Sequence, residues 1–256
     1  MNSLKYSVVI PCYKEEKILE KTVLTLQNIL KLEDFEIIIT VEQNPSHTIT
    51  VAKNLRRKYR NVKVLENNNQ YGKGYSVKRG VLMSKGEMVL VVDADLPVNL
   101  AKYFSYIITL IDDPQVGAVY VSSLGDKTCR RKRGVIRSEA SFWLFFLRRL
   151  FLNQGITDTQ LGCKLYKGSI AREIFSYVDE KGFLYELQVT DLLLNFGFQI
   201  EECIVRINWF SEQSSVDVSN LFKSTIKFFS YSLIGRHRLL RKSQTSEVRL
   251  IETSHP

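Results

Sequence analysis

The sequence GEMVLVVDADLP, residues 86–97, carries a run of apolar residues that ends on two carboxylates, Asp93 and Asp95. Residues 88–92 are all apolar and three of them are β-branched, which predicts an interior strand of a parallel sheet. Because side chains alternate along an extended chain, the two aspartates point the same way and could share one divalent cation. Pro97 cannot continue the ladder, so we expect the pair at the carboxyl end of the strand, where open α/β sheets bind ligands. A solvated turn with two helix-capping aspartates is the alternative.

The overall composition is that of a globular enzyme-sized domain. The chain has 256 residues, of which 45% are hydrophobic and 25% charged, and this length is sufficient for one large core. We therefore expect a single α/β domain over residues 1–215, followed by an amphipathic basic helix over 216–242 and a polar, disordered tail over 243–256.

The net charge of +9 is concentrated in a few clusters, at residues 130–133, 148–149 and 236–242. Basic clusters of this kind suit anionic partners. Because they flank apolar, aromatic segments, a membrane surface is favoured over nucleic acid, and we expect no nucleic-acid partner. A homo-oligomer is compatible with the same aromatic segments.

Cysteine and histidine usage excludes several classes of site. The four cysteines form no CxxC pair, and none of the three histidines stands beside an obvious nucleophile. Reduced thiols are therefore expected, and zinc sites and hydrolase triads are poor candidates. No apolar run approaches the length of a membrane span or a signal-peptide core, so we expect a cytoplasmic protein that is peripheral on the cytosolic face of a membrane.

Strands and helices alternate over the first hundred residues, which predicts parallel strands with right-handed crossovers. The expected strands span 6–12, 35–41, 62–65 and 88–92, and the expected helices span 15–30, a segment ending near 59, and 74–84. Further on we expect a helix to about residue 110, a strand over 116–122, a long helix over 134–153, a return to the core over 156–166, helices over 169–177 and 185–196, and a strand over 199–209.

Two loops before helices could contact a ligand at this edge of the sheet. In PCYKEE, residues 11–16, backbone amides and Glu15 could meet a nucleoside, although acidic residues also suit the first turn of a helix. In NQYGKG, residues 69–74, two glycines permit close backbone approach and Lys73 could neutralise a phosphate. The spacing is neither that of a P-loop nor that of a dinucleotide fingerprint. A glycine-rich helix start is the alternative.

The combined pattern resembles a known family. The segments that carry the resemblance are VVIPCYKEE (8–16), EIIITVEQNPS (36–46) and QYGKGYSVKRGVLMSKGEMVLVVDADLP (70–97). They are similar to the family 2 glycosyltransferases, which have the nucleotide-sugar-binding GT-A fold. Later segments resemble the subgroup of dolichyl- and polyprenyl-phosphate glucosyltransferases and mannosyltransferases: RGVIRS (133–138), DTQLGCKLY (158–166), GFLYELQVTDLL (182–193) and IEECIVRINW (200–209). The motifs occur in the same order over about residues 5 to 240.

The resemblance implies an inverting, metal-dependent enzyme that moves a hexose from a nucleotide sugar to a polyprenyl or dolichyl phosphate. The donor would be a UDP- or GDP-hexose, with UDP-glucose favoured, and the cofactor Mg²⁺ or Mn²⁺ on the donor diphosphate. The implied site residues are Asp93 and Asp95 for the metal; Asp95 and Asp158 for catalysis; Pro11, Tyr13, Glu15, Glu42, Lys73 and Asp93 for the donor; and Arg133 and Arg137 for the acceptor phosphate.

Three alternatives stay open. An acceptor with a sugar hydroxyl would need a carboxylate base, for which Asp158 is the candidate, whereas a lipid phosphate is already anionic. The basic run at 130–133 could be a solvated loop. Finally, Glu42-Gln43-Asn44-Pro45 replaces the DDGS-type run of the family, which motivates a non-catalytic nucleotide-sugar or membrane-binding module. Glu42 could still accept a hydrogen bond from a uracil or guanine imide, and Gln43 could pair more permissively.

Overall fold

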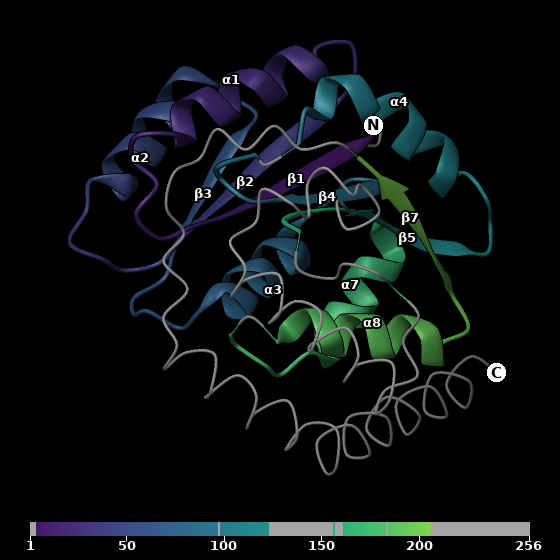
Figure 1. Cartoon of the computed structure of the whole chain (residues 1–256). Helices are drawn as coiled ribbons and strands as arrows, with labels where there is room; N and C mark the ends of the chain where they lie inside the picture. The colour runs from purple at the N-terminus through teal and green to yellow at the C-terminus, as the bar shows by residue number, and fades with distance from the viewer. Residues whose placement is uncertain (1–3, 97, 123–155, 157–160, 183, 206–256) are drawn as a thin grey trace, which may run out of the picture.

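Within the described residues, seven strands form one mixed sheet in the order β3-β2-β1-β4-β6-β5-β7. The computed structural model describes residues 4–96, 98–122, 156, 161–182 and 184–205 (Figure 1). The strands are β1 (Tyr6–Cys12), β2 (Phe35–Val41), β3 (Val62–Glu66), β4 (Met88–Val92), β5 (Val116–Ser122), β6 (Cys163–Lys167) and β7 (Gln199–Ile204). The helices are α1 (Leu19–Ile29), α2 (Thr48–Lys58), α3 (Lys73–Met83), α4 (Leu100–Ile111), α7 (Gly168–Tyr177) and α8 (Tyr185–Asn195).

Several predictions fall on residues outside the described ranges. They are the long helix over 134–153, the helix over 216–242, the tail over 243–256, and the site residues Asp158, Arg133 and Arg137.

The sheet is mostly parallel, as the sequence predicted. Strands β1 to β4 run parallel to one another, and β5 and β7 form a second parallel pair. Between them lies β6, which is antiparallel to both β4 and β5. The direction of β6 was not predicted, because a short buried run of five residues has the same pattern in either orientation.

Helices cover both faces of the sheet in Figure 1, with α1, α2 and α4 on one face and α3, α7 and α8 on the other. Alternate residues of β1 point to opposite faces of the sheet. Val8 and Ile10 pack with the first group of helices, whereas Val9 packs with the second. This doubly covered sheet explains why the strands are continuous apolar runs rather than alternating ones. The described cysteines, at positions 12, 163 and 203, are buried and free.

Helix α1 begins later than its sequence suggested, at Leu19 rather than Glu15. Residues 15–18 form a turn in which the N–H groups of Ile18 and Leu19 donate to the carbonyl of Glu15, at 3.1 and 3.0 Å. The N–H of Glu15 itself donates to Thr48 Oγ1 at the start of α2, at 2.9 Å. A contact with a residue 33 positions away therefore decides where this helix starts, and Glu15 stays in the loop after β1.

The glycines at the start of α3 leave room for the segment between α7 and α8 to pack closely against them. Gly72 has a φ of 107°, and a Cβ on it would lie 2.5 Å from the carbonyl oxygen of Lys181. A Cβ on Gly74 would lie 2.6 Å from the carbonyl oxygen of Glu180. We predicted that these two glycines allow a ligand to approach the backbone closely. Where they face residues 180–182, it is the backbone of the protein itself that approaches them.

Candidate active site

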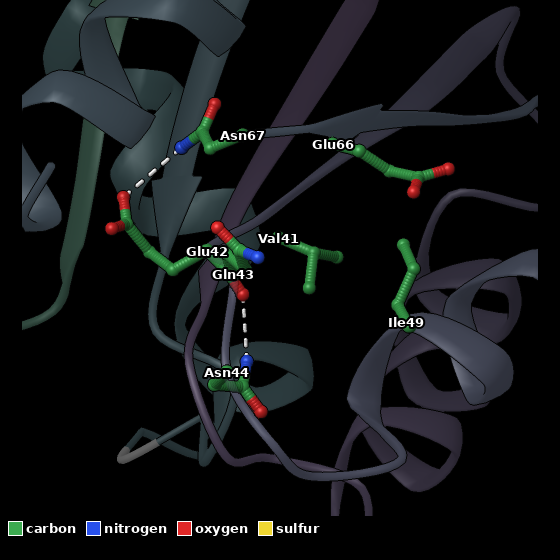
Figure 2. A pocket seen from close by; sticks show the side chains of 7 residues that line it. All are labelled: Val41, Glu42, Gln43, Asn44, Ile49, Glu66 and Asn67. Carbon is green, nitrogen blue, oxygen red and sulfur yellow. Dashed lines mark hydrogen bonds between the residues drawn. The ribbon is translucent and has the colours of Figure 1, made fainter. Parts of the chain in front are cut away.

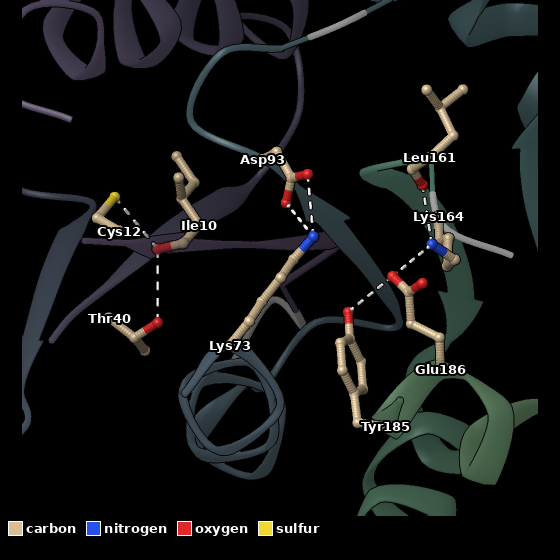
Figure 3. Close-up of polar contacts among 9 residues, drawn as sticks. All are labelled: Ile10, Cys12, Thr40, Lys73, Asp93, Leu161, Lys164, Tyr185 and Glu186. Carbon is tan, nitrogen blue, oxygen red and sulfur yellow. Dashed lines mark hydrogen bonds and ion pairs between the residues drawn. The ribbon is translucent and has the colours of Figure 1, made fainter. Parts of the chain in front are cut away.

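The carboxyl ends of β1, β2 and β4 meet at one edge of the sheet, because these neighbouring strands are parallel. Asp93 directly follows β4. Its N–H donates to the carbonyl of Gly162 at 2.9 Å, and its carboxylate pairs with Lys73 from the first turn of α3. The Lys73 Nζ lies 2.8 Å from Asp93 Oδ1 and 3.0 Å from Oδ2 (Figure 3). The structure therefore joins two of the residues predicted for the donor site.

The turn after Asp93 separates a buried residue from an exposed one. Ala94 is buried, and its carbonyl accepts a hydrogen bond from Thr22 of α1. Asp95 is exposed to solvent. Leu96 has a φ of 41°, a conformation that leucine seldom adopts, and its N–H closes the turn on the carbonyl of Asp93 at 2.9 Å. A left-handed leucine beside a paired aspartate is the kind of strain that clusters at functional sites.

Three carboxylates form an acidic cluster at this edge. Burial raises the pKa of Glu15, and the negative charges of Asp95 and Asp93 raise it further. Burial alone would lower the pKa of Lys73, but the charges of Asp93 and Glu186 outweigh burial and raise it. Among the described residues, the carboxylates of Glu15, Asp93 and Asp95 outnumber the Lys73 ammonium at this edge, which favours binding of an additional cation.

The composition of this cluster fits a divalent metal that is shared with a substrate. Carboxylate oxygens are the ligands that Mg²⁺ and Mn²⁺ prefer. In the part of the chain that the structure describes, no group of three or more potential ligands is preassembled. Mg²⁺ is usually held by one or two carboxylates together with substrate phosphates, and Asp93 and Asp95 match that requirement.

Glu42, which follows β2, is committed to contacts within the protein. It is 4% exposed. Its Oε1 accepts from Asn67 Nδ2 at 3.0 Å and from the Ser76 hydroxyl, and its Oε2 accepts from the N–H of Gly72 at 3.1 Å. This geometry does not support the hydrogen bond to a nucleotide base that the sequence suggested for Glu42. Through these hydrogen bonds the carboxylate instead connects the ends of β2 and β3 to the start of α3. The next residue in the chain, Gln43, is exposed to solvent.

A small pocket of about 110 Å³ opens beside Glu42, between the ends of β2 and β3 and helix α2 (Figure 2). It is lined by Val41, Glu42, Gln43, Asn44, Ile49, Glu66 and Asn67. The Asn44 side chain donates to the carbonyl of Glu42 at 2.6 Å, which folds the EQNP segment back on itself.

Two other predicted donor-site residues lie at the end of β1: Pro11 is within the strand, Tyr13 is in the loop that follows, and both are partly buried. The Tyr13 hydroxyl donates to Gln70 Oε1 at 3.3 Å, and Lys14 Nζ lies 5.1 Å from the centre of the Tyr13 ring. The loop after β1 and the loop before α3 therefore meet, and this contact brings Tyr13 to the same edge as Lys73.

Three residues near Asp93 were missed at the sequence level: Gly162, Lys164 and Glu186. A Cβ on Gly162 would overlap the Asp93 carboxylate. Lys164 and Glu186 form a buried ion pair with an Nζ–Oε1 distance of 2.9 Å. The signal that could have revealed the pair is a lysine within the apolar strand segment CKLY and a glutamate within the stretch 185–193 of α8, all of whose residues are buried.

Comparison with known proteins places the chain in a family. The model of glycosyl transferase family 2 matches residues 7–175. The chain belongs to this family. It is therefore a glycosyltransferase, and the DAD turn, the Lys73 loop and most of the sheet lie within the matched region.

Curated relatives of this glycosyltransferase carry one shared name. A dolichyl-phosphate beta-glucosyltransferase of Dictyostelium discoideum is 27% identical over 89% of this chain and 72% of its own length. The human dolichyl-phosphate beta-glucosyltransferase is 25% identical over 91% of this chain and 73% of its own length.

Solved structures confirm the GT-A fold of the glycosyltransferase. Mannosyl-3-phosphoglycerate synthase from Rubrobacter xylanophilus matches with a TM-score of 0.68 and 18% identity, over 92% of this chain and 75% of that one. Glucosyl-3-phosphoglycerate synthase from Mycobacterium tuberculosis, in complex with Mn²⁺, UDP and phosphoglyceric acid, matches with a TM-score of 0.66 and 17% identity, over 90% and 78%. Within the described ranges, no helix of the glycosyltransferase has the length and apolar character needed to cross a membrane.

The contacts of Glu42 lead to a test of its role. Replacing Glu42 with alanine should lower the free energy of unfolding by about 3 kcal/mol, because buried donors of Asn67, Ser76 and Gly72 would lose their acceptor. Denaturant unfolding measures this change. Glu66→Ala is the control, since Glu66 lines the same pocket but pairs with Lys53 at the surface, and its loss should cost below about 1 kcal/mol. A Glu42→Ala protein that keeps its stability and loses only donor affinity would restore the base-contact interpretation.

Proposed function

We propose that this glycosyltransferase moves glucose from UDP-glucose to the phosphate of a dolichol or related polyprenol, with inversion at the anomeric carbon. The observation that carries the proposal is the Asp93–Asp95 turn at the carboxyl end of β4, with Lys73 on Asp93 and Glu15 close by. The naming of the curated relatives as dolichyl-phosphate beta-glucosyltransferases supports the sugar and the acceptor. The Mycobacterium tuberculosis neighbour, in complex with Mn²⁺ and UDP, supports the donor class.

On the donor side, we assign the nucleoside to the loops after β1 and β2. Pro11 and Tyr13 would flank the base, and Glu15 would accept from the ribose. Gln43 takes the place of Glu42 as the residue that meets the base, because it is exposed at the same edge whereas Glu42 is internally bonded. An amide both donates and accepts, so Gln43 is compatible with the imide edge of uracil.

Asp93 and Asp95 would hold Mg²⁺ or Mn²⁺ against the donor diphosphate. The cation, when bound, supplies positive charge that stabilises the departing nucleoside diphosphate. Lys73 has a different role, because it holds the Asp93 carboxylate in position and adds a fixed positive charge beside the diphosphate.

On the acceptor side, a phosphate oxygen attacks the anomeric carbon while the bond from that carbon to the donor diphosphate breaks on the opposite face. A lipid phosphate is anionic near neutral pH, so the reaction requires cations to hold the acceptor rather than a strong base. We assign this role to Arg133 and Arg137, since guanidinium groups bind phosphate with two parallel hydrogen bonds. For an acceptor with a hydroxyl group, Asp158 would instead be required as the base.

A polyprenyl acceptor also requires access to a membrane. We propose that the protein works at the cytosolic face, where the aromatic and basic segments 134–153 and 216–242 lie at the level of the lipid head groups. Both segments combine Phe or Trp with Arg or Lys residues: the first carries only arginines and the second carries both, which is the composition of interfacial helices.

The acceptor assignment is tested by two variants assayed with UDP-glucose and a short dolichyl phosphate. Arg133→Gln/Arg137→Gln should reduce transfer by about 100-fold, because two charge-assisted hydrogen bonds to the phosphate are lost. Asp158→Asn should retain measurable transfer to dolichyl phosphate. Arg56→Gln/Arg57→Gln, at the exposed end of α2, removes the same charge elsewhere and serves as the control. Abolished transfer in Asp158→Asn, with full activity in the arginine variant, would favour a glycan hydroxyl acceptor.

A further inference from the structure

A buried ion pair lies behind the candidate site, between Lys164 of β6 and Glu186 of α8 (Figure 3). The two side chains are 2% and 5% exposed, and Nζ lies 2.9 Å from Oε1. Charged groups this deeply buried are rare, and an ion pair of this kind is often no more stable than apolar residues of the same volume. Stability alone is therefore a weak reason for the pair.

Each member of the pair makes further contacts. Lys164 Nζ donates to the carbonyl of Leu161 at 2.8 Å and lies 5.4 Å from the centre of the Tyr120 ring. The Tyr185 hydroxyl donates to Glu186 Oε1 at 3.2 Å. The pair thus connects helix α8 to the turn at residues 161–162, which leads into β6.

That turn is in direct contact with Asp93. The carbonyl of Leu161 accepts from Lys164 and also from the N–H of Cys163, at 2.7 Å. The next carbonyl, that of Gly162, accepts from the N–H of Asp93 at 2.9 Å. Gly162 also lies so close to Asp93 that an added Cβ would overlap its carboxylate. A displacement of the turn would therefore displace Asp93.

A second connection runs from the same pair to Lys73. The charge of Glu186, after that of Asp93, raises the pKa of Lys73 against the effect of burial. Helix α3 also packs closely on α8, since a Cβ on Gly74 would lie 2.7 Å from Tyr185 Cβ. Both partners of the Lys73–Asp93 pair are thus linked to the buried pair.

We propose that Lys164 is a positioning residue for nucleotide-sugar binding: it holds the 161–162 turn against Asp93, and Glu186 compensates its buried charge. The inference rests on the proposed function, which assigns Asp93 to the metal and the donor diphosphate. It distinguishes the two members of the pair. Lys164 contacts the turn directly, whereas Glu186 acts on the turn only through Lys164.

Three variants separate positioning from simple stability: Lys164→Met, Glu186→Gln and Lys164→Met/Glu186→Leu. The first leaves a buried carboxylate without its partner and should lower the melting temperature by roughly 10 °C. The double variant replaces both charges with apolar side chains of similar volume and should recover most of that loss. The exposed pair Lys58–Glu20, changed to Lys58→Met/Glu20→Leu, is the matched control.

The deciding measurement is the affinity for UDP in the presence of Mn²⁺, determined by calorimetry without any acceptor. Affinity in the double variant should fall by about 10- to 100-fold despite its recovered melting temperature, because the Leu161 carbonyl has lost the Lys164 donor. Glu186→Gln, which keeps that donor, should retain the parent affinity, and so should the Lys58→Met/Glu20→Leu control.

Parent-like affinity in the double variant would overturn the inference, as would an equal loss in Glu186→Gln. If the parent protein bound neither UDP nor GDP with Mn²⁺, the proposed function would fail and the inference with it. If the parent bound UDP with Mn²⁺ but transferred nothing to dolichyl phosphate, only the acceptor assignment would fail. The comparison between variants would then still decide the role of Lys164.

Discussion

Replacing Asp95 with asparagine is expected to reduce sugar transfer by about 10²- to 10³-fold, which is the usual effect of removing one group that stabilises developing charge. Asp95 is exposed, so the loss of its charge should change the free energy of unfolding by no more than about 0.5 kcal/mol. The amide keeps the shape of the side chain but not the negative charge that a divalent cation requires. Loss of activity without loss of stability would therefore identify a chemical role for Asp95.

Initial rates with UDP-glucose and dolichyl phosphate, measured over a range of Mn²⁺ concentrations, check this prediction together with a thermal melt. Asp112→Asn is the matched control, because Asp112 is an exposed aspartate at the end of α4. If Asp95→Asn kept the parent rate and the parent dependence on Mn²⁺, the metal would have to be held elsewhere.

Replacing Gly162 with alanine should have the second largest effect, through the position of Asp93. The added methyl group would overlap the Asp93 carboxylate, so either the carboxylate rotates away from Lys73 or the start of β6 moves. Overpacking of this kind costs about 1 to 3 kcal/mol of stability. A displacement of about 1 Å at a catalytic group can reduce the rate by roughly 100-fold.

The matched control for this variant is Gly117→Ala on β5. Its Cβ would lie 2.8 Å from Phe198 Cβ, so a similar steric cost arises next to an apolar residue. Denaturant unfolding and transfer rates should show comparable stability losses in the two variants and a large loss of activity in Gly162→Ala alone. Equal rates in the two variants would show that the position of Asp93 tolerates the added methyl group.

The sequence was sufficient for the parts of the fold that are encoded locally. The run 88–92 identified β4 and placed the two aspartates after its carboxyl end, because an apolar strand that stops on two carboxylates is visible within ten residues. The alternation of strands and helices likewise predicted the parallel core around β1.

What could not be predicted depends on partners far away in the chain. Glu42 follows a strand end, which is the usual place of a ligand-binding acid. Its carboxylate instead accepts a hydrogen bond within the protein from Ser76, which lies 34 positions later in the chain. The start of α1 depends on Thr48, and the direction of β6 depends on its pairing with both β4 and β5. Lys164 and Glu186 each stand out only as a charged residue in a buried element, and only the fold shows that they are partners.

The measurement that tests the central proposal most directly is a transfer assay with dolichyl phosphate and, in turn, UDP-glucose, UDP-N-acetylglucosamine and GDP-mannose. Each donor is supplied with and without Mn²⁺ or Mg²⁺, and Asp95→Asn provides the blank. We expect a lipid-linked glucose that forms only from UDP-glucose with the metal present, and none from the blank. Binding of UDP-glucose without any transfer to the lipid phosphate would contradict the proposed acceptor.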